Sequence, residues 1–143
     1  MPNRDDIVME ARSWLDVKWR HQGRTRNGID CAGLVILIGK KFGLTDYDTH
    51  NYKPRTNGFE FVHHFRDNMD EKKLTEAVSG DVILFRDKAF PCHTGILSDK
   101  FGSPHIIHAY APLLRVVEMP FQAPYTNGMK PIFCFQYRGI ENG

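Results

Sequence analysis

Two stretches of the chain carry apolar residues at helical spacing. The first lies near the N-terminus, where the apolar positions are Ile7, Val8, Ala11, Trp14 and Leu15. Asn3 or Asp5 can cap the start of this helix, and acidic residues in the first turn suit the positive end of its dipole. The second stretch predicts another helix through Phe59, Val62, Phe65 and Met69. Polar, glycine-containing stretches at 21–28 and 43–58 predict loops.

Residues 31–38 (CAGLVILI) are continuously apolar, so their periodicity does not distinguish a buried strand from a buried helix. Their valine and isoleucine content favours a strand. Gly39-Lys40-Lys41, directly after the run, is typical of a helix end instead, because basic residues suit the last carbonyls of a helix. Both interpretations stay open on these residues alone.

From Gly80 onward the pattern changes to short apolar or alternating runs separated by turn residues. The runs cover 81–85, 93–97, 105–110, 116–119 and 132–137. Turn signals such as Ser103-Pro104 and Asn127-Gly128 separate them, which predicts antiparallel strands. Helices followed by strands indicate an α+β fold with the helices packed on one face of a sheet.

Length and composition narrow the class of protein. The 143 residues fit a single domain over 1–143, and 41% hydrophobic with 25% charged residues fits an ordinary folded core. A net charge of +2 is too balanced for a protein that coats nucleic acid. No apolar run approaches the ~20 residues of a membrane span, and residues 1–10 lack the apolar core of a secretory signal. Three cysteines without a CxxC pair argue against a disulfide framework or a paired-ligand zinc site.

Cys31 is the first candidate for chemistry, since Gly28, Ile29 and Asp30 lead into the apolar run that it begins. If the run is a helix, Cys31 lies in its first turn. Free backbone N–H groups and the helix dipole would there lower the pKa of the thiol, as a nucleophile requires. The alternative is that Cys31 is a small buried hydrophobe, as most free cysteines are.

Histidines supply the second part of a possible site. If runs 93–97 and 105–110 pair as a hairpin, with a turn containing Gly102, Ser103 and Pro104, His93 can lie opposite His108 on one face. His93 would take the proton of Cys31, and His108 would hold the His93 ring. His105 has the wrong parity and should face the other side. A metal site of Cys92, His93, His105 and His108 is a weaker alternative, because adjacent ligands on a strand point to opposite faces.

Other polar residues have simpler interpretations. His63 and His64 fall on the second helix and are expected on a solvated face. His21 is close to Cys31 in sequence and can line a cleft. Cys92 is expected to face away from the site, and Cys134 to be a core residue within an alternating run.

Four blocks of residues together resemble the NlpC family of papain-like cell-wall cysteine peptidases. They are residues 28–35 (GIDCAGLV), 80–85 (GDVILF), 93–96 (HTGI) and 107–109 (IHA). The family reads roughly D-C-S-G-hydrophobic, G-D-hydrophobic-hydrophobic-F, H-V-G-I and hydrophobic-H-A in this order. The resemblance runs from about Trp14 to Ala109. It implies a papain-like fold in which the cysteine starts a central helix packed on the sheet.

The resemblance also implies roles for individual residues. Cys31 matches the family nucleophile, His93 the general base and His108 the third, polar catalytic position. Asp30 matches an acidic position that in relatives helps to bind the free amine of the substrate. Trp19 stands near a position where the family often has a tyrosine whose hydroxyl lies close to the nucleophile, and Ala32 replaces the usual serine. We therefore expect Asp30, Trp19 and His21 to contribute to substrate binding.

The expected function is amide hydrolysis in peptidoglycan stem peptides through an acyl-enzyme, without metal or organic cofactor. The resemblance implies a bond between D-glutamate and a diamino acid. Residues 19–24 resemble family members of tailed phages and prophage-like particles, which implies synthesis in the cytoplasm without a signal peptide and association with phage tail proteins. The alternatives are a tail assembly component with little hydrolytic activity, and a related thiol amidase or acyltransferase.

Overall fold

Helices precede strands along the chain. The computed structural model describes residues 1–49, 59–122 and 128–141. Within them lie the helices α1 (Arg4–Arg12), α2 (Cys31–Lys41) and α3 (Phe59–Asn68). The strands are β1 (Arg24–Thr25), β2 (Gly28–Ile29), β3 (Asp70–Lys72), β4 (Val82–Arg86), β5 (Pro91–Lys100), β6 (Ser103–Tyr110), β7 (Arg115–Pro120) and β8 (Lys130–Gln136). Short 3-10 helices cover Leu74–Glu76 and Ala111–Leu113.

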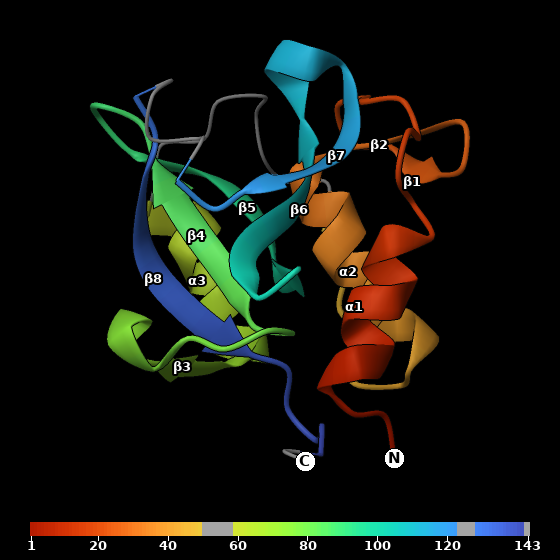
Figure 1. Ribbon diagram of the computed structural model, residues 1–143, viewed down its shortest axis with the longest axis vertical. Helices are drawn as coiled ribbons and strands as arrows, with labels where there is room; N and C mark the ends of the chain where they lie inside the picture. The colour runs from red at the N-terminus through yellow and green to blue at the C-terminus, as the bar shows by residue number, and fades with distance from the viewer. Residues whose placement is uncertain (50–58, 123–127, 142–143) are drawn as a thin grey trace.

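Six strands form one antiparallel sheet in the order β3-β8-β4-β5-β6-β7, and β1 and β2 form a separate small ribbon. Figure 1 shows α3 behind β4 and β8, with α2 and α1 beside β6. The main core joins residues of all three helices to alternate residues of the strands, and a smaller cluster around Ile83, Phe85 and Ile106 covers the opposite face. The predicted α+β fold is confirmed.

The N-terminal helix is shorter than its apolar pattern suggests. Asn3 caps α1 in a capping box with Asp6, and the helix ends at Arg12. Trp14 and Leu15 therefore lie in the turn beyond it, where Asp16 adopts a left-handed φ of 71°. Trp14 is still buried in the main core, and the Arg26 guanidinium lies 3.7 Å above its ring. The chain reverses after Arg12 while its apolar side chains continue to face the core.

The apolar run 31–38 belongs to a helix, so the strand that its composition favours is wrong and the helix implied by the family resemblance is confirmed. Asp30 caps α2, and Lys40 and Lys41 occupy its last turn. Its β-branched residues suit a strand intrinsically, but α2 is covered on several sides by the sheet and by the other helices. A helix buried in this way is apolar around most of its circumference, which removes the usual 3.6-residue signal.

The strands after Gly80 agree with the predicted runs to within a few residues. The connection between β5 and β6 consists of Phe101 and Gly102, whose φ angles of 57° and 78° are those of a type I′ turn. Ser103 and Pro104 were expected in this turn but begin β6. Asn127 of the predicted turn and most of the loop at 43–58 lie outside the described residues, while Gly128 has a left-handed φ of 83°.

Asp81, directly before β4, contacts α1, β3 and the segment that precedes β4. Its carboxylate is fully buried and accepts from Arg4 Nη1 at 2.6 Å and Lys72 Nζ at 2.9 Å. It also accepts from the Val78 N–H at 2.9 Å. The preceding Gly80 has a φ of 94°, and a Cβ there would lie 2.9 Å from Arg4 Cβ. The Gly-Asp pair thus anchors α1 and the β3 edge to the sheet, and its role in this fold is structural.

Candidate active site

Cys31 is the first residue of α2 and is half-buried at the end of the helix that meets the sheet. The backbone N–H groups of Thr94 and Ala32 hydrogen bond its sulfur and favour a negative charge there. Burial and the charge of Asp30 outweigh these donors and raise the pKa of the thiol to about 12. The expectation of a lowered pKa is therefore wrong, because the first turn is covered by protein rather than open to water.

The hydrogen-bonded pairing between β5 and β6 ends close to Cys31. Pairing between β5 and β6 extends from Lys100–Ser103 to Ile96–Ile107, while β5 reaches back to Pro91 and β6 runs on to Tyr110. Thr94 lies in the part of β5 beyond this ladder, and its N–H is one of the donors to Cys31. On the other side of β5, the register with β4 shifts at Cys92, since Phe85 pairs with His93 but Arg86 with Pro91. Such bulges redirect side chains next to functional sites.

His93 and His108 are in direct contact. His93 Nε2 lies 2.6 Å from His108 Nδ1, and the side chains are 7% and 0% exposed. The predicted shared face is confirmed, but the predicted register is wrong. Continuing the β5–β6 pairing beyond Ile96–Ile107 places Gly95, not His93, opposite His108. The two histidines are diagonal neighbours, and the missing side chain at Gly95 leaves space for the Cβ of His108.

The hydrogen bond between the rings determines which nitrogen of His93 can accept a further proton. Because His93 Nε2 is committed to His108, Nδ1 is the ring nitrogen left to accept a proton. If His93 accepts at Nδ1, its own proton must lie on Nε2 and point to His108 Nδ1. His108 then carries its proton on Nε2, which is buried and has no hydrogen-bond partner among the described residues.

Both imidazoles are held in the neutral form. Burial lowers the pKa of His93 to about 4. Burial and the neighbouring His93 lower the pKa of His108 well below its usual value. Together with the raised pKa of Cys31, these shifts favour a neutral thiol beside neutral imidazoles at pH 7.

Asp30 holds the start of α2 and the preceding loop in place. Its carboxylate accepts from the Gly33 N–H at 2.8 Å, the Gln22 N–H at 2.7 Å and Arg24 Nη1 at 3.2 Å. The side chain is only 3% exposed. Asp30 is therefore engaged within the protein, and its predicted contact with substrate stays a prediction.

The other two predicted binding residues lie close to the same loop. His21 is half-buried, with Nδ1 4.0 Å from Asp30 Oδ2. The Trp19 side chain packs partly against the main core, and its backbone N–H donates to the Leu114 carbonyl at 2.9 Å. Both residues are thus placed beside the segment that carries Cys31, but their roles toward substrate stay predictions.

His105 and Cys134 lie apart from the His93–His108 pair. His105 bonds the Ser103 carbonyl at 2.9 Å and is not part of the histidine pair. Cys134 is fully buried in the smaller core cluster, as expected. In the described part of the chain, no three His, Cys, Asp or Glu side chains are grouped as metal ligands, so the alternative set around Cys92 is not assembled.

No helix among the described residues is long and apolar enough to cross a membrane.

Sequence reasoning missed the aromatic residues around the histidines. The Tyr110 ring stacks on His108 at 4.6 Å with an interplanar angle of 13°. Phe85 lies 5.7 Å from the His93 ring, opposite it on β4. Tyr110 follows His108 by two residues, so strand alternation could have identified it as a neighbour on the same face.

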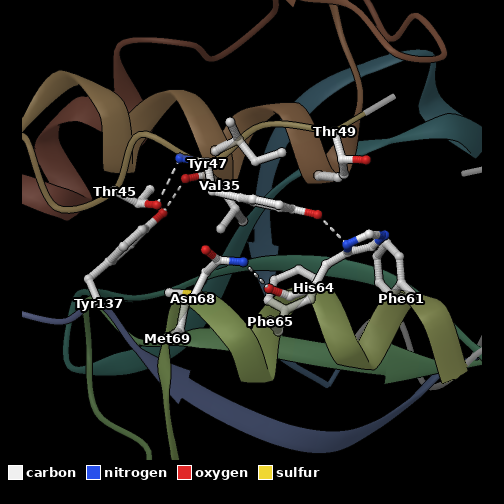
Figure 2. Close-up of a pocket in the computed structure, with 12 residues that line it drawn as sticks. Val35, Thr45, Tyr47, Thr49, Phe61, His64, Phe65, Asn68, Met69 and Tyr137 are labelled. Carbon is white, nitrogen blue, oxygen red and sulfur yellow. Dashed lines mark hydrogen bonds between the residues drawn. The ribbon is translucent and has the colours of Figure 1, made fainter. Parts of the chain in front are cut away.

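His64 was expected on a solvated face of its helix, but this expectation is wrong. It lines a narrow apolar pocket between α2 and α3, where its Nδ1 hydrogen bonds the Tyr47 hydroxyl (Figure 2). His64 Nε2 is buried without a hydrogen-bond partner among the described residues. The pocket measures about 40 Å³, which is room for a few water molecules but not for a peptide. His63 is exposed, as expected.

The α+β fold is shared with solved NlpC/P60 domains. The family model described as the NlpC/P60 family matches residues 16–130, and the chain belongs to this family. No curated protein matches the chain.

Solved structures with the same fold include three that differ in length and source. The NlpC/p60 domain of the peptidoglycan hydrolase SagA is 17% identical, with a TM-score of 0.64 over 94% of this chain and 98% of that one. An NlpC/P60 family protein from Bacillus cereus is 21% identical, with a TM-score of 0.70 over 95% of this chain but 40% of that one. An N-acetylmuramoyl-L-alanine amidase from Bacteroides uniformis is 12% identical, with a TM-score of 0.57 over 93% and 98%.

Proposed function

We propose that this chain is a cysteine peptidase that hydrolyses an amide bond in the stem peptides of peptidoglycan. One observation carries the proposal. The half-buried thiol of Cys31, at the start of a helix, is hydrogen bonded by the N–H of the residue that follows His93, and His93 is paired with His108 at 2.6 Å. Membership of the NlpC/P60 family supports this reading.

The proposed reaction starts from the neutral pair. The Cys31 thiol gives its proton to His93 Nδ1 as sulfur attacks the substrate carbonyl, and His108 Nδ1 accepts a hydrogen bond from the resulting imidazolium. The Cys31 backbone N–H, freed by its place at the helix start, stabilises the oxyanion. His93 then protonates the leaving amine, which breaks the amide bond and leaves a thioester on Cys31. Water attacks the thioester with His93 as base and restores the thiol.

The bond that is cut is a separate part of the proposal. The family resemblance favours the bond between D-glutamate and a diamino acid. The same residues can serve an amidase, and one structural neighbour of the same fold is named as an N-acetylmuramoyl-L-alanine amidase. The two reactions release different products, since the amidase separates the whole peptide from the sugar and the endopeptidase cuts within the peptide.

Delivery by a phage tail or a prophage-like particle remains part of the proposal, supported by the resemblance of residues 19–24 alone. Copurification of the chain with intact tail particles would support it. Recovery of the chain only as free protein from cells that release such particles would count against it.

Digestion of purified peptidoglycan and of defined stem peptides tests the enzymatic proposal, with products identified by mass spectrometry. The wild type should release cut stem peptides, and Cys31→Ala should release none. Cys92→Ala is the matched control, because Cys92 is also half-buried and precedes His93 directly; it should retain activity. If the wild type is inert on several wall types, the assembly-component alternative takes precedence.

A further inference from the structure

We infer that Tyr110 and Gly95 are positioning residues that fix the plane of the His108 ring and its distance from β5, so that its Nδ1 can bond His93 and this bond can select one orientation and one tautomer of the ring. The inference rests on the proposed function for its effect on turnover, but the orientation itself can be measured in the absence of any substrate.

The first support is the arrangement of the rings. Rotation of His108 by half a turn about its Cβ–Cγ bond would replace Nδ1 with a carbon and break the 2.6 Å contact with His93. The His93 and His108 rings meet edge to face at 4.8 Å, whereas Tyr110 lies nearly parallel to His108 at 4.6 Å. Tyr110 is 2% exposed, so its ring is itself fixed by the surrounding protein. A flat, immobile ring stacked on the imidazole defines the plane in which His108 lies.

This support from packing matters because hydrogen bonding holds only one side of the ring. His108 Nε2 has no partner among the described residues, so the bond to His93 alone distinguishes the two nitrogens. In many Cys/His sites an amide or carboxylate oxygen holds the base, and either of its lone pairs can serve. An imidazole has a single acceptor nitrogen, so its orientation and its tautomer must both be correct.

Gly95 provides the second support. A Cβ at this position would lie 2.9 Å from His108 Cβ, 2.9 Å from Ile106 Cγ1 and 2.9 Å from the Ile107 carbonyl oxygen. Ordinary contacts of a Cβ begin at 3.4 Å, so His108 or its strand would have to move by about half an ångström. The φ of Gly95 is not in the left-handed region, so space rather than backbone conformation excludes a side chain here. Gly95 thus allows His108 to approach β5 closely enough to reach His93.

Two-bond ¹H–¹⁵N spectra of the histidine rings test the inference in the full chain, with signals assigned by His93→Gln and His108→Gln. In the wild type, His93 and His108 should each carry the proton on Nε2 alone. Tyr110→Phe keeps the ring and should keep this pattern. Tyr110→Leu and Gly95→Ala should each convert the His108 signals to a mixture of tautomers. Gly39→Ala is the matched control, because its Cβ would crowd Thr45 at 2.7 Å in a different part of the chain.

The effect on turnover follows from the same displacement. Misplacement of a catalytic group by a fraction of an ångström to one ångström costs up to about 100-fold. We expect kcat on stem peptides to fall about 10- to 100-fold in Tyr110→Leu and Gly95→Ala, with KM changed less than about twofold. A single, unchanged His108 tautomer in both folded variants would overturn the inference, as would a mixture in Tyr110→Phe equal to that in Tyr110→Leu. Inactive wild type with the expected tautomers would instead contradict the proposed function alone.

Discussion

Replacement of Asp30 separates its role in the fold from the role in substrate binding that the family resemblance implies. The carboxylate is 3% exposed and accepts three hydrogen bonds, from Gly33, Gln22 and Arg24. Loss of the helix cap costs about 1 kcal/mol. Loss of the buried bonds from Gln22 and Arg24 adds about 1–3 kcal/mol. Asp30→Ala should therefore lower the free energy of unfolding by about 2–4 kcal/mol, or Tm by roughly 10 °C.

Urea and thermal unfolding followed by circular dichroism measure this effect. Asp30→Asn keeps one acceptor oxygen for the Gly33 N–H and should lose about half as much. Asp87→Ala is the matched control, because its carboxylate also accepts two backbone bonds, from Ala89 and Phe90, but in an exposed turn. It should cost less than about 1 kcal/mol. Asp30→Ala with wild-type stability would refute the reasoning, and a raised KM in a stable Asp30→Asn would return the residue to substrate binding.

Three further predictions follow from charge and burial. Alkylation of Cys31 by iodoacetamide should accelerate about tenfold per pH unit from pH 6 to 9, because its thiol pKa is about 12; a plateau across this range would indicate a thiolate–imidazolium pair instead. The pKa of His93 falls to about 4 on folding, so the unfolded state binds the proton first as pH drops. The free energy of unfolding should accordingly decrease as the pH falls from 6.5 to 4, with His93 contributing up to about 1.4 kcal/mol per unit, and a neutral His93→Gln should reduce this dependence to the part that comes from His108. Asp81→Ala leaves Arg4 and Lys72 without their buried partner and should cost about 3–5 kcal/mol in urea unfolding, whereas a cost below about 1 kcal/mol would contradict the anchoring role.

The helices α1 and α3 could be predicted because each has one face on the core and therefore a clear period. The strands after Gly80 could be predicted as short apolar runs between turn residues, although β4 is buried on both faces. α2 could not, since it is covered on several sides and its β-branched residues suit a strand equally well. Only the resemblance of residues 28–35 to a known family identified it as a helix. β3 was also missed, because this edge strand is polar on both sides and has no apolar residue; it consists of Asp70, Glu71 and Lys72.

The residues of the site could be predicted better than their geometry. Strand parity placed His93 and His108 on one face, which the 2.6 Å contact confirms. It could not fix the register, because the register depends on which two residues form the turn, and in the β5–β6 hairpin these are Phe101 and Gly102. The pKa of Cys31 depends on how far the surrounding protein buries its thiol. The placement of His64 depends on its hydrogen bond to the hydroxyl of Tyr47, which lies in the segment before α3. These properties arise from tertiary packing and have no local signal.

The central claim is that amide hydrolysis passes through a thioester on Cys31. Turnover of a defined stem peptide in the presence of hydroxylamine tests this most directly, with products resolved by mass spectrometry. The account predicts that wild type forms the hydroxamate at the scissile carbonyl in competition with the free acid, and that Cys31→Ala forms neither. Formation of the acid alone at every hydroxylamine concentration, or turnover by Cys31→Ala, would contradict it.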